Sequence, residues 1–282
     1  MSLIVTVTKP LNTLILSKVY RTPFLRRMDL VIQLYLYRWQ AEQDPYRRQV
    51  KYERQMEIDE CFQRNLHHPA IRVVYLLCES REVADYYLDI AKSYNKVMNC
   101  VFVNFGKQPT YADFLRYVAH QIPDNHIVCI QNSDIFIDHS VSKEFLDRTV
   151  GPYTLVALTR HEYTDEEHSE CSEKTCPLIW DYQGSHDTFL FRMPLPPTLP
   201  LERVNHHQNV YGGETLFMKA FQDAGKVLVN PCFDMRIFHR HRNRAVLANY
   251  PTLADGYLCH VNPVAPQGRD DIRSKLKTLF KD

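Results

Sequence analysis

Apolar runs of strand length alternate with segments of helical periodicity along the first half of the chain. Residues 71–78, 98–105, 126–130 and 154–158 are rich in branched apolar side chains, and a longer β-rich run covers 29–39. Apolar positions at helical spacing predict helices over 52–66, 110–122 and 140–150, with Thr110 as a candidate N-cap. This alternation predicts an α/β fold with a mostly parallel sheet that helices flank on both faces.

The second half of the chain is less regular. A polar, acidic loop over 161–181 precedes a short strand over 188–191 and a proline-rich connection over 193–200. A helix over 214–224 ends at Gly225, and strands are predicted over 227–229 and 232–239. We expect a single catalytic domain over 29–260, with a donor half over about 29–138 and an acceptor half over about 139–260. An N-terminal extension of unassigned structure (1–28) precedes it, and a basic tail or helix (261–282) follows.

Composition excludes several classes of protein. Only 8 of the 282 residues are glycine and no G-x-G occurs, so neither the dinucleotide fingerprint nor a P-loop is present. The net charge is 34 − 33 = +1, so no overall field favours nucleic acid, which is not an expected partner. No apolar run approaches the length of a membrane span and the N-terminus lacks a basic signal region, so we expect a soluble protein.

Eight cysteines are spread widely, and four of them lie in or beside apolar runs, where a free cysteine is a common buried residue. We therefore expect a reducing, cytoplasmic compartment. Cys171 and Cys176 form the one close pair, with His168 nearby. A loop disulfide and a zinc half-site are both open there, and neither is favoured because a second half-site is missing.

Polar side chains gather where the predicted strands begin or end. The triplet Asn132-Ser133-Asp134 ends one strand, Arg160 follows another, Asp187 precedes a third, and Gly212-Gly213 precedes Glu214 at the start of a helix. His239 and His241 are two residues apart, so they share one face of a strand. Because ligands of open α/β sheets bind beyond the carboxyl ends of the strands, these side chains are expected on one rim. An aspartate there can hold a divalent cation, or it can simply cap the turn.

The order of these motifs resembles that of GT-A fold glycosyltransferases, and more narrowly that of small glycosyltransferase-like proteins of bacteria and large algal viruses. The matching segments span roughly 29–242. They are Arg54-Gln55-x-Glu57 with Cys61 and Asn65, Asn132-Ser133-Asp134-Ile135, Leu158-Thr159-Arg160, Ser185-His186-Asp187, and Asn230-Pro231 followed by His239-x-His241. Two departures stand out. Asn132 replaces the first acid of the usual Asp-x-Asp metal motif, and Glu214-Thr215 replaces an acidic doublet.

The resemblance implies a metal-dependent, inverting transfer of a hexose or xylose from a nucleotide-sugar, most simply a UDP-sugar, to a glycan acceptor hydroxyl. It implies Mn²⁺ (or Mg²⁺) held by Asp134 and His239, and Glu214 as the general base with Asp187 as its competitor. Donor contacts would come from five further residues: Arg54, Asn132, Ser133, Arg160 and His241. More ordinary roles remain open, since Glu214 can merely stabilise its helix and Arg54 can merely pair with Glu53 or Glu57.

Two other functions fit parts of the pattern. A sugar-nucleotide nucleotidyltransferase also uses a cation on a doubly wound sheet, but it usually needs a glycine-rich loop after the first strand, where this chain has Tyr37-Arg38-Trp39. A non-catalytic module that binds sugars or nucleotides is the alternative from another class.

Overall fold

A computed structural model describes residues 4–6, 27–139, 141–163, 178, 186–208, 210–240 and 253. The predicted tail 261–282, most of the loop 161–181, the Cys171–Cys176 pair and His241 lie outside the described residues. None of the described helices has the length and apolarity that a bilayer crossing requires.

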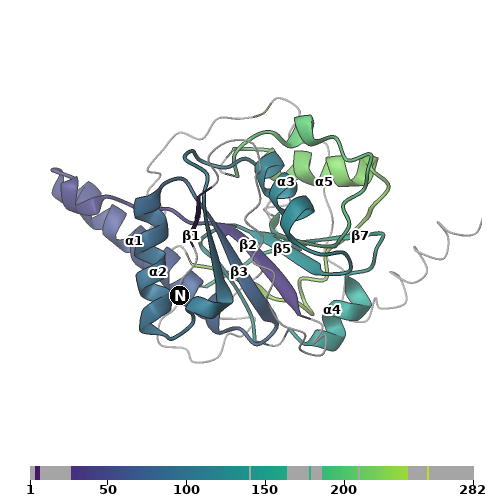
Figure 1. Cartoon of the computed structure of the whole chain (residues 1–282), viewed down its shortest axis with the longest axis horizontal. Helices are drawn as coiled ribbons and strands as arrows, with labels where there is room; N and C mark the ends of the chain where they lie inside the picture. Colours follow the sequence, from purple (N-terminus) through teal and green to yellow (C-terminus); the bar gives the residue numbers. More distant parts are fainter. Residues whose placement is uncertain are drawn as a thin grey trace, which may run out of the picture.

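A sheet of eight strands forms the centre of the structure (Figure 1). Its spatial order is β1 (Ile4–Thr6), β4 (Cys100–Asn104), β3 (Ile71–Cys78), β2 (Met28–Gln33), β5 (Ile127–Gln131), β9 (His186–Arg192), β7 (Thr154–Thr159) and β10 (Val227–Val229). Strand β9 is antiparallel to both of its neighbours, and the other neighbouring pairs are parallel. The predicted α/β class with a mostly parallel sheet is confirmed. Strand β1 adds an edge strand from the segment that had no predicted structure.

Helices cover both faces of this sheet (Figure 1). Helices α1 (Pro45–His67) and α2 (Arg81–Ser93) lie on one face, and α3 (Tyr111–Gln121) and α5 (Gly213–Asp223) lie on the other. A fifth helix, α4 (Lys143–Thr149), and three short 3₁₀ turns (Trp39–Ala41, Val97–Asn99, Leu201–Val204) complete the described helical structure. Thr110 caps α3 as predicted, because its side chain accepts a hydrogen bond from the Asp113 amide.

Three sequence predictions need correction. Helix α1 begins at Pro45, well before residue 52, because Asp44 caps it; residues 45–49 are exposed and show no apolar periodicity that would reveal this start. The run 29–39 ends as a strand at Gln33, and the strand predicted over 232–239 covers only Ile237–His239. Helix α2 was not predicted, although Ser80 caps it and apolar residues line one side.

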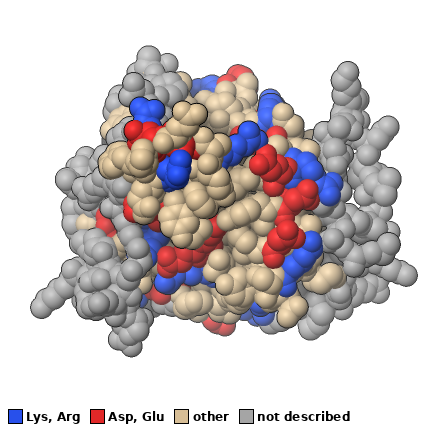
Figure 2. Space-filling view, turned by 90° about the vertical axis from the view of Figure 1, so that its left-hand side faces the viewer, with Lys and Arg blue, Asp and Glu red and all other residues tan. Residues whose placement is uncertain are grey.

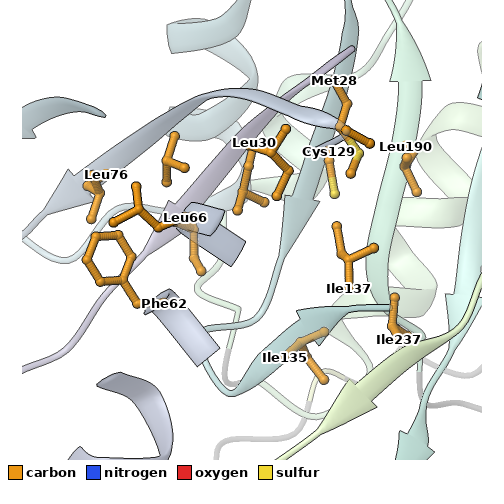
Figure 3. Packing of buried hydrophobic residues seen from close by; sticks show 14 of the residues in the cluster. Met28, Leu30, Phe62, Leu66, Leu76, Cys129, Ile135, Ile137, Leu190 and Ile237 are labelled. Carbon is orange, nitrogen blue, oxygen red and sulfur yellow. The ribbon is translucent and has the colours of Figure 1, made fainter. Parts of the chain in front are cut away.

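The core is divided between the two faces. On the α1 side, Phe62 and Leu66 pack against side chains of the large sheet such as Leu30 and Leu76 (Figure 3). On the α3 and α5 side, aromatic rings dominate, and the ring centroids of Phe189 and Phe217 are 4.6 Å apart. The outer surface on the α1 and α2 side carries acidic and basic side chains interspersed with one another (Figure 2).

A second sheet of three strands brings distant segments to the edge of the large one. Strand β11 (Ile237–His239) lies antiparallel to β6 (Ile135–Ile137) and parallel to β8 (His161–Glu162). In this register His239 lies opposite Ile135 on one side and Glu162 on the other. The small sheet therefore places His239 next to the end of the triplet and next to the residues that follow β7.

The strand order also fixes where a ligand can bind. From β2 the chain runs outward through β3 and β4 and then returns to β5 on the other side of β2. This change of direction is a topological switch point, and the crevice outside the carboxyl ends of the strands there is the usual ligand site of such sheets. Asn132 follows β5 directly at this point.

Asn65 joins α1 to the strand that follows the triplet. Its amide Nδ2 donates to the Ile135 carbonyl at 2.8 Å and its Oδ1 accepts from the Ile137 amide at 3.1 Å. Asn65→Ala leaves the Ile137 amide without this acceptor and the Ile135 carbonyl with only its bond from Nε2 of Gln131, so we expect it to lower the free energy of unfolding by about 1–3 kcal/mol. Met56→Ala, at an exposed position of the same helix, is the control and should cost less than about 0.5 kcal/mol. Equal costs in urea unfolding would contradict this role.

Candidate functional site

The predicted site residues within the described part of the chain converge on the carboxyl ends of β2, β5 and β7. Arg54 comes from α1, Asn132 to Asp134 from the turn after β5, Arg160 from the end of β7, Asp187 from β9, Glu214 from α5 and His239 from β11. Ser133, in the middle of the triplet, is buried. Polar contacts link these residues into two groups. We call one the cation half (Arg54, Asp134, Glu162 and His239) and the other the base half (Asn132, Asp187 and Glu214).

Asp134 is the centre of the cation half. Its Oδ2 lies 3.1 Å from Nε2 of His239 and accepts a hydrogen bond from Nη2 of Arg54 at 2.8 Å. The backbone fixes this placement, because the amide of Arg240 donates to the Asp134 carbonyl at 2.9 Å. The side chain of Asp134 is thus directed to residues from two other elements and not merely to the turn that it ends.

The charges of this half are strongly coupled. Burial alone would raise the pKa of Asp134, but His239 and Arg54 outweigh burial and hold it well below its usual range. Burial likewise opposes the protonated form of His239, yet Asp134 and Glu162 raise the pKa of His239 to about 9. At neutral pH the Asp134 carboxylate is therefore ionised and the His239 ring is protonated, so the two side chains form an ion pair.

Glu162 completes the cation half, and the sequence analysis did not identify it. Both of its carboxylate oxygens lie 3.1 Å from Nδ1 of His239. A histidine that ligates a metal usually donates its other ring N–H to a carboxylate, which orients the ring and fixes the tautomer. Glu162 can do this for His239 and leave Nε2 directed at Asp134.

Oδ2 of Asp134 and Nε2 of His239 form an ion pair in this structure, and they are the two candidate ligand atoms for a divalent cation, which would replace the proton between them. Adjacent ligands of an octahedral cation, each at about 2.1 Å, are about 3 Å apart, and the two candidate ligand atoms are 3.1 Å apart. No group of three or more histidine, cysteine or carboxylate side chains among the described residues could hold an ion. The protein would thus supply two ligands, as is common where phosphates and water complete the shell of Mg²⁺.

The base half contains two carboxylates that share one amide. Nδ2 of Asn132 donates to Oδ1 of Asp187 at 2.7 Å and lies 3.5 Å from Oε1 of Glu214. Oδ2 of Asp187 accepts from Nη1 of Arg160 at 3.1 Å, whereas Oε2 of Glu214 accepts from the His186 amide at 3.1 Å. Both oxygens of Asp187 thus have close donors, while the contact that the described residues give to Oε1 of Glu214 is the long one from Asn132.

Glu214 has the perturbed acidity of this pair. Its burial and the negative charge of Asp187 raise its pKa well above the usual range for glutamate. The His186 amide, Arg160 and Asn132 oppose this shift only in part. The raised pKa makes Glu214 the candidate general base of the pair.

Arg160 joins the two halves. Its Nε donates to Oε1 of Glu162 at 2.9 Å, and its Nη1 donates to Asp187. The same guanidinium therefore holds the carboxylate that orients His239 and the carboxylate next to Glu214. The site is one continuous network from α1 to α5.

Some of the residues that hold the site residues in place lie in motifs that the sequence analysis identified. Asn230, from the predicted Asn-Pro motif, accepts from the Thr159 amide at 3.1 Å and donates to its hydroxyl at 2.8 Å, which positions the end of β7. Glu57, from the predicted Arg-Gln-x-Glu motif, pairs with Arg54 in the buried part of α1. Glu162 follows the predicted strand together with Arg160, but its position in the sequence indicates no role, because only the pairing of β8 with β11 places it against His239.

The glycine pair before Glu214 sets the start of α5. Gly212 has a positive φ of 82°, and a Cβ on Gly213 would lie 2.8 Å from Cε1 of His206. Gly213→Ala should therefore displace the first turn of α5 and Glu214 with it, lowering the free energy of unfolding by about 1–3 kcal/mol and reducing turnover. Adding His206→Ala should recover most of the loss, as a double-mutant cycle of thermal unfolding can show. Additive losses would refute the clash.

Similar solved structures share the general architecture at low identity. PcManGT, a mannosyltransferase from Pyrobaculum calidifontis in complex with GDP-Man and Mn²⁺, is 13% identical over 78% of this chain and 58% of that chain, with a TM-score of 0.47. TarS from S. aureus with UDP-GlcNAc is 11% identical over 89% and 66%, with a TM-score of 0.43. A 4-diphosphocytidyl-2C-methyl-D-erythritol synthase from Anaerococcus prevotii is 12% identical over 73% and 87%, with a TM-score of 0.41.

No protein-family model and no curated protein matches the chain. At these identities and TM-scores, the structural likeness carries no information about the substrate or the activity of this chain. A function has to be supported by the residues of the site.

Proposed function

We propose that this protein is a metal-dependent, inverting glycosyltransferase of the GT-A type, with a nucleotide-sugar as donor and a hydroxyl group as acceptor. One observation carries the proposal. A candidate cation site built from Asp134, His239 and Glu162 is joined through Arg160 to a pair of carboxylates, Asp187 and Glu214, at the switch point of the sheet. Transfer of a sugar to a hydroxyl needs these two parts together: a place for the diphosphate and a base beyond it.

The cation half is suited to the leaving diphosphate. Asp134 and His239 would hold Mn²⁺ or Mg²⁺, and the ion would supply positive charge where negative charge develops on the leaving phosphate. Arg54 contacts Asp134, and Arg160 contacts Glu162 next to His239; a guanidinium matches phosphate oxygens in geometry and charge. We expect a UDP-linked donor, with Asn132, Ser133 and His241 as further donor contacts.

The base half is suited to the acceptor. Glu214 would accept the proton of the acceptor hydroxyl, and it must come within about 3 Å of that oxygen to do so. Asp187 has close donors on both oxygens and would orient Asn132 and Arg160 instead. A lone base on the acceptor side gives direct displacement at the anomeric carbon, with inversion of its configuration. We expect a glycan acceptor, because the residues around Glu214 are polar.

The carboxylate pair also favours sugar transfer over nucleotidyl transfer. In nucleotidyl transfer the nucleophile is a sugar phosphate, which is already largely ionised at neutral pH and needs no base. A half-buried glutamate with a raised pKa can act as the base that a hydroxyl nucleophile needs. The two reactions release different products, a nucleoside diphosphate or pyrophosphate.

A thermal-shift panel tests the binding part of the proposal. The wild-type protein is heated with UDP, GDP, CDP or ADP, each with and without Mn²⁺, and with a short oligonucleotide. We expect one nucleoside diphosphate, UDP first, to raise the Tm in the presence of Mn²⁺, because a ligand that binds only the folded state stabilises it. The oligonucleotide should have no effect. A response to the oligonucleotide and to no nucleoside diphosphate would contradict the proposal.

A further inference from the structure

Arg54 occupies a position that a cation site would not be expected to contain. Its guanidinium contacts Oδ2 of Asp134, the same oxygen that faces Nε2 of His239. It is buried, and its Nη1 also contacts Glu57 and lies 3.4 Å from the carbonyl of Arg240. Glu57 and the Arg240 carbonyl thus help to hold a permanent positive charge against the carboxylate that would ligate the ion.

The positive charge of Arg54 disfavours binding of a divalent cation without a nucleotide. Arg54 already neutralises much of the charge of Asp134, and an ion bound by that carboxylate would lie close to a guanidinium in a poorly solvated place. With two protein ligands, Asp134 and His239, the protein offers little to offset this repulsion. A diphosphate reverses the balance, because its oxygens can complete the shell of the ion and accept hydrogen bonds from Arg54.

We propose that Arg54 makes the Asp134–His239 site accept a divalent cation together with a nucleoside diphosphate, and not the cation alone. The inference rests on the proposed function, since it assigns the same site to the same class of donor. It adds that the ligand of this site is the complex of cation and nucleotide, and that Arg54 is the residue that disfavours binding of the cation alone.

The test measures binding, not turnover. Free Mn²⁺ is followed by electron paramagnetic resonance while protein is titrated, first with Mn²⁺ alone and then with UDP or the nucleoside diphosphate that the thermal-shift panel selects. In the wild type we expect weak binding of Mn²⁺ alone and at least about tenfold tighter binding with the nucleotide, within the usual range of coupling between ligands. By reciprocity, Mn²⁺ tightens nucleotide binding by the same factor.

Arg54→Met removes the charge and the hydrogen-bond donors but keeps an unbranched side chain that packs against apolar neighbours. We expect it to tighten binding of Mn²⁺ alone by about tenfold, to weaken binding of the nucleotide, and to reduce the coupling factor correspondingly. A purely structural role for Arg54 would lower the Tm without producing these opposite changes. Arg64→Met is the matched control, since Arg64 lies on the same helix and pairs with Glu60 at 2.8 Å, apart from Asp134.

Arg54→Gln, which is neutral but can still donate to Asp134, replaces Arg54→Met if the latter does not fold, and the same directions are expected. Mn²⁺ affinity that is unchanged or weaker in the neutral variant, while the wild type still binds Mn²⁺ with the nucleotide, would overturn this inference and leave the proposed function intact. Absence of any nucleotide binding in the wild type would overturn both.

Discussion

Glu214→Gln is expected to lower kcat/KM by about 10²- to 10⁴-fold, the usual contribution of a positioned general base. Glutamine keeps the shape of the side chain and can still accept the hydrogen bond of the His186 amide, so folding should be unaffected. Asp187→Asn is the matched comparison, because Asp187 shares the Asn132 amide and has close donors on both oxygens. Initial rates of nucleoside diphosphate release measure both variants.

The pH profile separates the two carboxylates further. Activity that needs ionised Glu214 is lost as the pH falls through the pKa of Glu214. Burial and Asp187 raise that pKa well above the usual range, so the acid limb should lie at a higher pH than an ordinary glutamate would give. Asp187→Asn removes one of the causes and should move the acid limb to lower pH. A large loss in Asp187→Asn with a near-normal rate in Glu214→Gln would reassign the base to Asp187.

Asp134→Asn is expected to abolish cation-dependent nucleotide binding. Replacing a residue that only orients a metal ligand typically costs 10- to 100-fold in metal affinity, so loss of a ligand itself should weaken nucleoside diphosphate binding in Mn²⁺ by about 100-fold or more. Glu162→Gln should give a loss of about 10- to 100-fold, because Glu162 contacts the ring of His239 from the far side. Titration calorimetry with Mn²⁺ present measures both.

Asp138→Asn is the control for these charge changes. Asp138 follows the same small strand but pairs with Arg236 at 2.7 Å, away from Asp134. Its effect on nucleotide affinity should be less than about threefold. If Asp134→Asn bound the nucleotide as tightly as Asp138→Asn does, Asp134 would be only a structural partner of Arg54 and His239.

The fold could be predicted from the sequence where local patterns decide it. Strand β3 and strand β10 are found at the predicted residues, and Thr110 caps its helix, because continuous apolar runs and capping residues leave clear local signals. The early start of α1 at Pro45 could not be predicted from apolar periodicity, since residues 45–49 are exposed.

The same distinction applies to the site: residues with a local sequence signal could be predicted, and residues placed only by contacts between distant segments could not. Asp134, Asp187 and Glu214 could be found because a carboxylate at the end of a strand or the start of a helix stands out against apolar neighbours. Glu162 could not, because its role comes from the pairing of β8 with β11, two segments far apart in the sequence. Likewise, the motif marked Arg54, but only the packing of α1 against β6 shows that its guanidinium reaches Asp134.

The most direct test of the central claim is nucleoside diphosphate release from a panel of nucleotide-sugars. The account predicts that one donor is cleaved to its nucleoside diphosphate in Mn²⁺, and that EDTA or Asp134→Asn abolishes the release. Equal release in EDTA, release from no nucleotide-sugar, or pyrophosphate release from a nucleoside triphosphate and a sugar phosphate would contradict it.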